Sequence, residues 1–239
     1  FMSSSMIRPF FVSLTLFGLL LSVRVWGYEF THLTKDNNGL SYDGISAIMQ
    51  DSRGFIWIGT YKGLNRYDGN TFKVYGMLEM GLDSDFVYSI VEDSEGNLWI
   101  GTEGGGINRW DRRDGRFVYY TQESRCGLTS NMIKKLWHDG NDRLLVSAFN
   151  GGMRVFDERQ GRFSDLHMNH PASGQPLSVY DFAKEGDRGI WLTDPDAELM
   201  YKDASTGRVE TVRLTDAQGN AVRIHIETLF HDERGNLWL

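Results

Sequence analysis

The sequence predicts an all-β fold, a β-propeller built of four-stranded blades, from three observations. A short pattern centred on a tryptophan recurs at Trp57, Trp99, Trp191 and Trp238, and Leu145 takes the tryptophan's place in between. The spacings are 42, 46, 46 and 47 residues, a range typical of propeller blades or solenoid repeats. Within a repeat, apolar residues alternate with a period of two and show no helical period of 3.6, which favours four strands per repeat.

The first repeat shows the expected order of strands and turns. Strand patterns cover residues 44–51, 55–60, 64–68 and 71–75, and the short breaks between them contain Gly, Asp or Asn. Because these residues are favoured in tight turns, each break predicts a turn between antiparallel strands. Trp57, Trp99 and Trp191 hold the same place on the second strand, and we expect their rings to be buried between neighbouring blades.

Most of the recurring residues are expected to serve the scaffold. The Asp of the "DSRG" and "DSEG" turns can accept backbone N–H groups, and the Gly supplies a positive φ without steric cost. Since repeated positions serve the repeat, we expect structural roles for Asp51, Gly54, Trp57, Gly59, Thr60, Asp93, Gly96, Trp99, Gly101, Thr102, Trp191 and Trp238.

The two ends of the chain suggest how it is organised. In residues 1–27, one positive charge at Arg8 precedes the apolar run 9–23, which predicts a signal peptide and a periplasmic location. An uncleaved membrane anchor is the alternative, although the run is short for a span. Residues 28–239 are expected to form the propeller, with 28–34 as an extra strand. The repeat breaks off at Leu239 inside a strand, so we expect an incomplete propeller of four blades and the start of a fifth.

Composition excludes several classes of function. The formal net charge is −7 and no run of Lys and Arg occurs, so we expect no nucleic-acid binding. Cys126 is the single cysteine and cannot form an internal disulfide. His167 and His170 share a loop, but the sequence offers no third metal ligand close to them. We therefore expect neither a metal site nor a cofactor.

Residues 39–75 and 85–120 closely resemble the two-component regulator propeller repeat. The resemblance weakens in the third and fourth repeats, where Leu145 replaces Trp and Asp194 follows the tryptophan strand. It implies the extracytoplasmic sensor of a hybrid two-component histidine kinase that detects a glycan breakdown product. It also implies a homodimer formed through the full-length protein and a connection to the membrane by the signal segment or by a further helix.

A ligand site is expected where the loops between second and third strands meet the loops between blades. Aromatic side chains in these loops could stack on sugars. The candidate ligand-binding residues are Tyr61, Lys62, Glu103, Phe149, Asn150, Asp194 and Asp196.

No residue is predicted to be catalytic, but two other classes of function stay open. A propeller enzyme acting on polysaccharide, a lyase or a glycosidase, could use paired carboxylates among Glu103, Asp194, Asp196 and Glu198. A non-catalytic interaction scaffold is the other alternative, since the fold alone does not fix the function.

Overall fold

Each sequence repeat forms one antiparallel sheet, because its four short strands are joined by tight turns. In the computed structural model the strands of each sheet pair in chain order, and we call these sheets blades one to four. The structure describes residues 31–76, 81–139, 143–157, 160–222 and 224–239. The strands of the blades are β1 (Ile45–Gln50), β2 (Ile56–Thr60), β3 (Gly63–Tyr67), β4 (Phe72–Tyr75), β5 (Val87–Glu92), β6 (Leu98–Thr102), β7 (Ile107–Asp111), β8 (Arg116–Tyr120), β9 (Ile133–His138), β10 (Arg143–Ala148), β11 (Gly152–Asp157), β12 (Arg162–Asp165), β13 (Asp181–Glu185), β14 (Gly189–Thr193), β15 (Leu199–Asp203) and β16 (Val209–Thr211).

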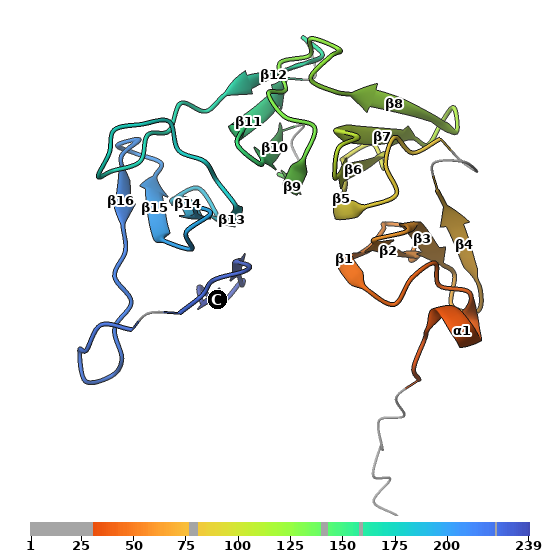
Figure 1. Cartoon of the computed structure of the whole chain (residues 1–239), viewed down its shortest axis with the longest axis horizontal. Helices are drawn as coiled ribbons and strands as arrows, with labels where there is room; N and C mark the ends of the chain where they lie inside the picture. The colour runs from red at the N-terminus through yellow and green to blue at the C-terminus, as the bar shows by residue number, and fades with distance from the viewer. Residues whose placement is uncertain (1–30, 77–80, 140–142, 158–159, 223) are drawn as a thin grey trace, which may run out of the picture. The chain divides into compact units, whose positions relative to one another are not determined.

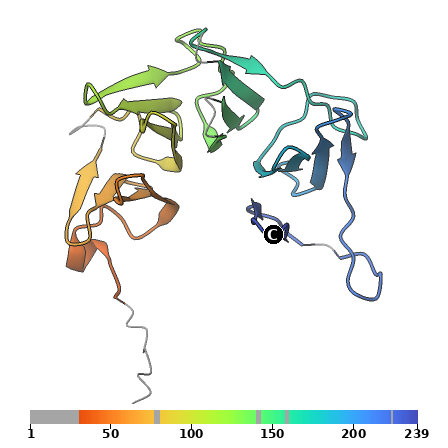
Figure 2. The same cartoon turned by 180° about the vertical axis from the view of Figure 1, so that it is seen from behind.

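The blades follow one another in a series within residues 33–239, which form one unit. Their first strands β1, β5, β9 and β13 neighbour one another in turn. The first strand of each blade lies on the inner side of the series and the fourth strand on the outer side (Figures 1 and 2). This is the arrangement of propeller blades, so the predicted fold class is confirmed.

The recurring Asp carries out two tasks in each turn. In blade one, Oδ1 of Asp51 accepts the backbone N–H groups of Arg53 and Phe55, at 3.0 and 2.9 Å. Its Oδ2 accepts the indole N–H of Trp57 at 2.8 Å. The equivalent carboxylate of blade two, Asp93, accepts the indole N–H of its own tryptophan at 2.9 Å. One side chain therefore fixes both the turn and the ring that packs between blades.

The recurring Gly residues meet two different needs. Gly54 and Gly96 adopt φ of 87° and 84° in the Asp turns, a conformation that favours glycine. Gly59 lies instead against the next blade, where an added Cβ would come within 2.7 Å of Val87. Gly101 has the same position against β9. The glycine of the tryptophan strand thus allows neighbouring blades to approach closely.

The hydrophobic core lies between blades. One cluster joins Trp57 and Leu64 of blade one to Leu98 and Ile100 of blade two. Thr60 and Thr102, which follow the close-packed glycines, are fully buried. The Thr60 hydroxyl donates to the carbonyl of Gly63 at 3.0 Å, and the Thr102 hydroxyl donates to the carbonyl of Gly106 at 2.9 Å.

The four tryptophans of the repeat differ in burial, which corrects one expectation. Trp57 and Trp99 are buried between blades as predicted. Trp191 is only partly buried, because its ring borders an open pocket at the edge of blade four. Trp238 is 60% exposed, although Asp232 still accepts its indole N–H at 3.0 Å.

The beginning and end of the described chain are less regular. Residues 31–34 form no strand, and the short helix α1 (Lys35–Asn38) follows, so the expected extra strand is absent from the described part of 28–34. The predicted signal peptide lies outside the described residues. The fifth unit contains only β17 (Phe230–His231) and β18 (Leu237–Trp238). Among the described residues, no helix has the length and hydrophobicity needed to cross a bilayer.

Candidate functional site

An irregularity at the same place in the first strands directs side chains toward the middle of the blade series. The pairing of β1 with β2, of β5 with β6 and of β9 with β10 each skips one residue, at Ser46, Tyr88 and Lys134. Such a bulge re-aims the side chain of the extra residue. In blade four Tyr180 holds the equivalent position, because it lies three residues before Ala183, the residue that pairs with Trp191.

These four positions line one pocket, which we call the central pocket. Its volume is about 390 Å³, and its walls come from the first strands of blades one to four and from Glu227 and Thr228. The four equivalent positions carry three residue types, Ser, Tyr and Lys, unlike the nearly constant pattern of the Asp turns in blades one and two. Variation at equivalent positions within a repeat is expected where side chains meet a ligand, since the scaffold does not dictate them.

Three aromatic rings surround the ammonium group of Lys134 in this pocket. Its Nζ lies 4.0 Å from the ring centre of Tyr88, 5.4 Å from that of Tyr180 and 5.9 Å from that of Phe149. Burial lowers the pKa of Lys134, and the charge of Glu103 opposes this effect. The side chain is therefore a partly desolvated cation held by aromatic faces.

Tyr88 is held in its neutral form by its surroundings. Burial, and then the nearby charge of Glu103, raises the pKa of Tyr88 to about 12. Its hydroxyl donates a hydrogen bond to the Glu103 carboxylate at 3.2 Å. At neutral pH the Tyr88 hydroxyl consequently keeps its proton, and Glu103 accepts its hydrogen bond.

Further aromatic rings extend from the central pocket toward blade one. Tyr88 stacks on Phe86 with ring centres 4.5 Å apart, and Phe86 contacts Tyr61 at 4.1 Å. Tyr61 contacts Tyr42 at 5.9 Å, and the Lys62 ammonium lies 5.3 Å from the Tyr42 ring. We call Tyr42, Tyr61, Phe86 and Tyr88 the aromatic row. Tyr61 is 49% exposed, so a ligand can reach this row from solvent.

Hydrogen bonds between neighbouring first strands keep the walls of the pocket in place. Ser46 donates to the carbonyl of Val87, and the hydroxyl of Ser89 accepts the backbone N–H of Leu136 at 3.0 Å. Lys135 pairs with Asp181 at 2.6 Å and also donates to the carbonyl of Leu229 at 2.9 Å. Four successive sheets are thus connected around the pocket.

The structure brings together four of the seven predicted site residues. Tyr61, Lys62, Glu103 and Phe149 lie at the aromatic row or around Lys134. Asn150, the next residue after Phe149, lines a different pocket between blades three and four. Asp194 and Asp196 line a further pocket of about 1130 Å³ on blade four.

Sequence reasoning missed Tyr88 and Lys134 on the inner strands, and it missed Tyr42, Phe86 and Tyr180, which precede inner strands. It considered the loops between second and third strands and those between blades. Comparing equivalent positions of the first strands, spaced like the tryptophans, could have identified three of them.

Two carboxylates, those of Asp194 and Glu198, lie near His170, and sequence reasoning did not foresee this cluster. Ligand atoms of His170, Asp194 and Glu198 lie within 4.8 Å of one another. However, Nδ1 of His170 accepts the backbone N–H of Ala172 at 3.2 Å, which leaves the proton on Nε2, and this nitrogen lies 2.9 Å from Glu198. A proton at Nε2 does not suit a metal ligand. The arrangement therefore fits a hydrogen-bonded His–Glu pair better than a metal centre.

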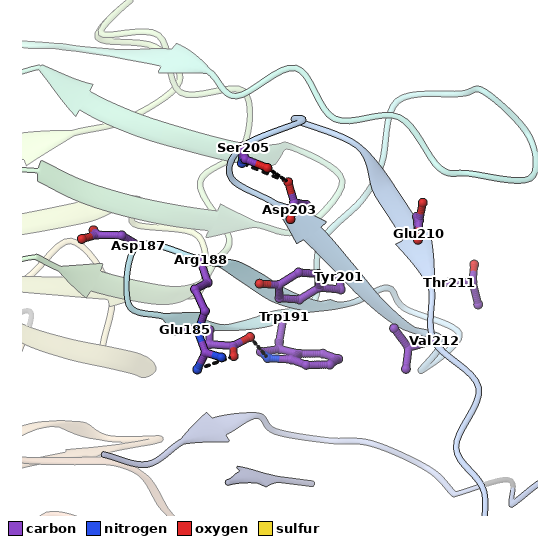
Figure 3. A pocket seen from close by; sticks show the side chains of 10 residues that line it. All are labelled: Glu185, Asp187, Arg188, Trp191, Tyr201, Asp203, Ser205, Glu210, Thr211 and Val212. Atoms are coloured by element: carbon purple, nitrogen blue, oxygen red, sulfur yellow. Dashed lines mark hydrogen bonds and ion pairs between the residues drawn. The ribbon is translucent and has the colours of Figure 1, made fainter. Parts of the chain in front are cut away.

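Figure 3 shows the open pocket beside Trp191. Unlike the central pocket, it is not lined by the bulge residues of the first strands. The indole N–H of Trp191 donates to Glu185 at 3.0 Å, and Arg188 pairs with the same carboxylate at 2.7 Å. In blades one and two, aromatic rings of the following blade lie at the equivalent interface, for example Phe156 at 5.0 Å from Trp99. All residues that line this pocket belong to blade four, so it lies on the blade face that corresponds to the packed interface of blades one and two.

Comparison with known proteins identifies the repeat. The profile of the two-component regulator propeller matches residues 39–62 and 81–104, the turn and tryptophan strand of blades one and two. Over 38 residues the chain is 50% identical to histidine kinase P4 of Formosa agariphila, which covers 16% of this chain and 3% of that kinase.

Similarity to solved structures extends over most of the chain. The extracellular domain of a hybrid two-component system from B. thetaiotaomicron superposes with a TM-score of 0.68 at 22% identity, covering 87% of this chain and 28% of that one. A catalytically inactive virginiamycin B lyase from Staphylococcus aureus, solved with quinupristin, gives a TM-score of 0.56 at 16% identity, covering 80% and 62%. At these identities the likeness concerns the fold alone. The profile assigns residues of blades one and two to two-component regulator propeller repeats, and over the rest of the chain the similarity concerns the propeller fold.

Proposed function

We propose that this propeller is the extracytoplasmic ligand-sensing part of a hybrid two-component sensor kinase. It detects an oligosaccharide released by glycan breakdown and signals to a kinase and regulator portion. The chain spans only a small part of the kinase and the extracellular domain that it resembles, so the proposal rests on its own site.

The observation that carries the proposal is the aromatic row leading into the central pocket. Sugar rings have apolar faces that pack on aromatic side chains, and their hydroxyl groups need hydrogen-bonding partners nearby. The row supplies ring faces from Tyr61 to Tyr88, and Glu103 and Lys134 supply an acceptor and a donor at its inner end. This combination suits an elongated saccharide better than a compact apolar ligand.

We propose that the propeller binds without catalysing a reaction. Among the carboxylates considered for a glycosidase, Asp194 and Glu198 approach each other within the range of a retaining pair. Both are already engaged, because Oδ1 of Asp194 accepts the backbone N–H groups of Asp196 and Glu198 and Glu198 pairs with His170. Their arrangement shapes the loop of blade four, so the full-length protein should release no product from a bound glycan.

Binding is tested by calorimetric titration of the full-length protein with a panel of neutral and acidic oligosaccharides. We expect at least one member to bind, and Tyr61→Ala to weaken its affinity at least tenfold, since stacking on an exposed ring is lost. Tyr119→Ala is the matched control, because Tyr119 is a similarly exposed tyrosine on the outer strand of blade two. Equal affinities for wild type and Tyr61→Ala, or no binding to any member, would reject the proposal.

The location and assembly of the protein belong to the same proposal. We propose export to the periplasm by residues 1–27 and a homodimer formed through the full-length protein. Sequencing of the mature N-terminus is expected to begin near Tyr28. An intact N-terminus on cytoplasmic protein would contradict the export.

A further inference from the structure

Two adjacent lysines of β9, Lys134 and Lys135, differ in the partners of their ammonium groups. Lys135 is fully engaged, because its Nζ pairs with Asp181 at 2.6 Å and donates to the Leu229 carbonyl at 2.9 Å. Lys134 points into the central pocket from the bulge. Within the residues that the structure describes, its ammonium group has neither a hydrogen bond nor an ion pair; its contacts are the three aromatic rings.

The charged groups around Lys134 do not neutralise it by direct contact. Glu103 accepts the hydrogen bond of the Tyr88 hydroxyl and makes no ion pair with Lys134. Asp181 is committed to Lys135 and to the backbone N–H groups of Phe182 and Leu229. Glu227, the other carboxylate that lines the pocket, also makes no ion pair with Lys134.

The surroundings of Lys134 favour the binding of a negatively charged group next to its ammonium. Aromatic faces attract a cation, but they cannot accept its three N–H groups as an oxygen can. Burial lowers the pKa of Lys134, so the charged form is disfavoured as long as no counter-charge is present. An oxyanion bound at Nζ would offset the cost of burying the charge and would accept hydrogen bonds from the ammonium N–H groups.

We propose that the central pocket takes an acidic sugar residue, whose carboxylate or sulfate ester group binds Lys134 while the sugar ring lies against Tyr88 and Tyr180. This inference rests on the proposed function and narrows its ligand to anionic saccharides. Neutral oligosaccharides can still pack along the aromatic row, but they leave the ammonium of Lys134 without a counter-charge.

The test uses the full-length protein and calorimetric titration with pairs of oligosaccharides. Uronate-containing fragments are compared with their carboxyl-reduced forms, and sulfated fragments with their desulfated forms, so the two arms distinguish the sources of negative charge. We expect an acidic member to bind and its neutralised partner to bind at least tenfold more weakly. Lys134→Met should weaken binding of the acidic member at least tenfold, and Lys134→Arg should recover most of it.

The control is Lys184→Met, because Lys184 also lies over an aromatic ring, 5.7 Å from Trp137, but does not line the pocket. Thermal melts verify that each variant is folded. A second readout is the pKa of the Lys134 side chain by NMR in the wild type, which should rise when the acidic fragment binds.

The outcomes separate this inference from the proposed function. Equal binding of an acidic fragment and its neutralised partner, or a folded Lys134→Met variant with wild-type affinity, would overturn the acidic ligand. Binding of neutral members alone would overturn it too, while leaving the proposed oligosaccharide sensor in place. Binding of no member at all would reject both.

Discussion

The tryptophan slot of the repeat allows packing to be measured separately from hydrogen bonding. Trp99 is 1% exposed, stacks on Tyr120 at 5.4 Å and meets Phe156 edge-on at 5.0 Å. Trp238 is 60% exposed. Both indoles donate to the Asp of their own turn at nearly the same distance, 2.9 and 3.0 Å. The two positions therefore share the polar contact and differ in burial.

We expect Trp99→Ala to lower the free energy of unfolding by about 3–5 kcal/mol, the usual cost of removing a buried aromatic side chain. Trp238→Ala should cost below about 1 kcal/mol, as for other exposed substitutions. Trp99→Phe keeps a ring between Tyr120 and Phe156 but leaves Asp93 without the indole N–H, which should cost about 1–3 kcal/mol.

Urea denaturation of the full-length protein, followed by circular dichroism, measures the three values under one set of conditions. Similar losses for Trp99→Ala and Trp238→Ala would refute the reasoning, since burial would then not determine the contribution of the slot. A loss for Trp99→Phe as large as that for Trp99→Ala would assign the stability to the hydrogen bond instead.

The remaining predictions concern the contact between blades. Gly101→Ala should cost about 1–3 kcal/mol, because the added Cβ would lie 2.7 Å from Cγ2 of Ile133. Ile133→Leu, which is not branched at Cβ and so lacks Cγ2, should recover part of the loss in urea denaturation, and an additive double variant would contradict this. Asp51 has a lowered pKa: burial acts to raise it, but the Trp57 indole, the backbone N–H groups and Arg112, 2.6 Å away, outweigh burial. Because the folded-state pKa is depressed, the carboxylate contributes stability above about pH 4, the ordinary Asp value, and loses it as the pH falls through the folded pKa. The stability difference between wild type and Asp51→Asn should accordingly shrink on acidification, and a difference independent of pH would count against the ion pair.

The scaffold could be predicted from the sequence because its signals are local. Turn residues such as Asp51 and Gly54 act within a few positions of one another, and the tryptophan strand repeats at nearly constant spacing. The burial of Trp191 could not be predicted in this way. Its neighbours depend on what lies beyond the edge of blade four, and the repeat pattern contains no information about that contact.

The candidate site was only partly predictable for a different physical reason. Loop residues such as Tyr61 and Phe149 could be assigned, because equivalent loops of equivalent blades lie on one face. Tyr88 and Lys134 lie on strands, where strict alternation would send every second residue toward the core. A bulge breaks that alternation and turns the extra side chain into the pocket. Since a bulge depends on pairing with the second strand, the sequence of the first strand does not reveal it.

The division between constant and variable positions explains how one repeat can both fold and recognise a ligand. The Asp turn, the tryptophan and the close-packed glycine act on the flanks of each blade and stay nearly the same in blades one and two. The bulge position carries Ser46, Tyr88, Lys134 and Tyr180 in succession, three residue types in four blades. A substitution of Tyr88, Lys134 or Tyr180 is expected to change the wall of the central pocket and not the Asp turn or the close-packed glycine. The hydrogen bond between Leu136 and Ser89 and the Lys135–Asp181 pair connect neighbouring first strands without these side chains. The pocket can consequently change its chemistry without loss of the surrounding scaffold, and a ligand that contacts Tyr88, Lys134 and Tyr180 at once would bridge three blades.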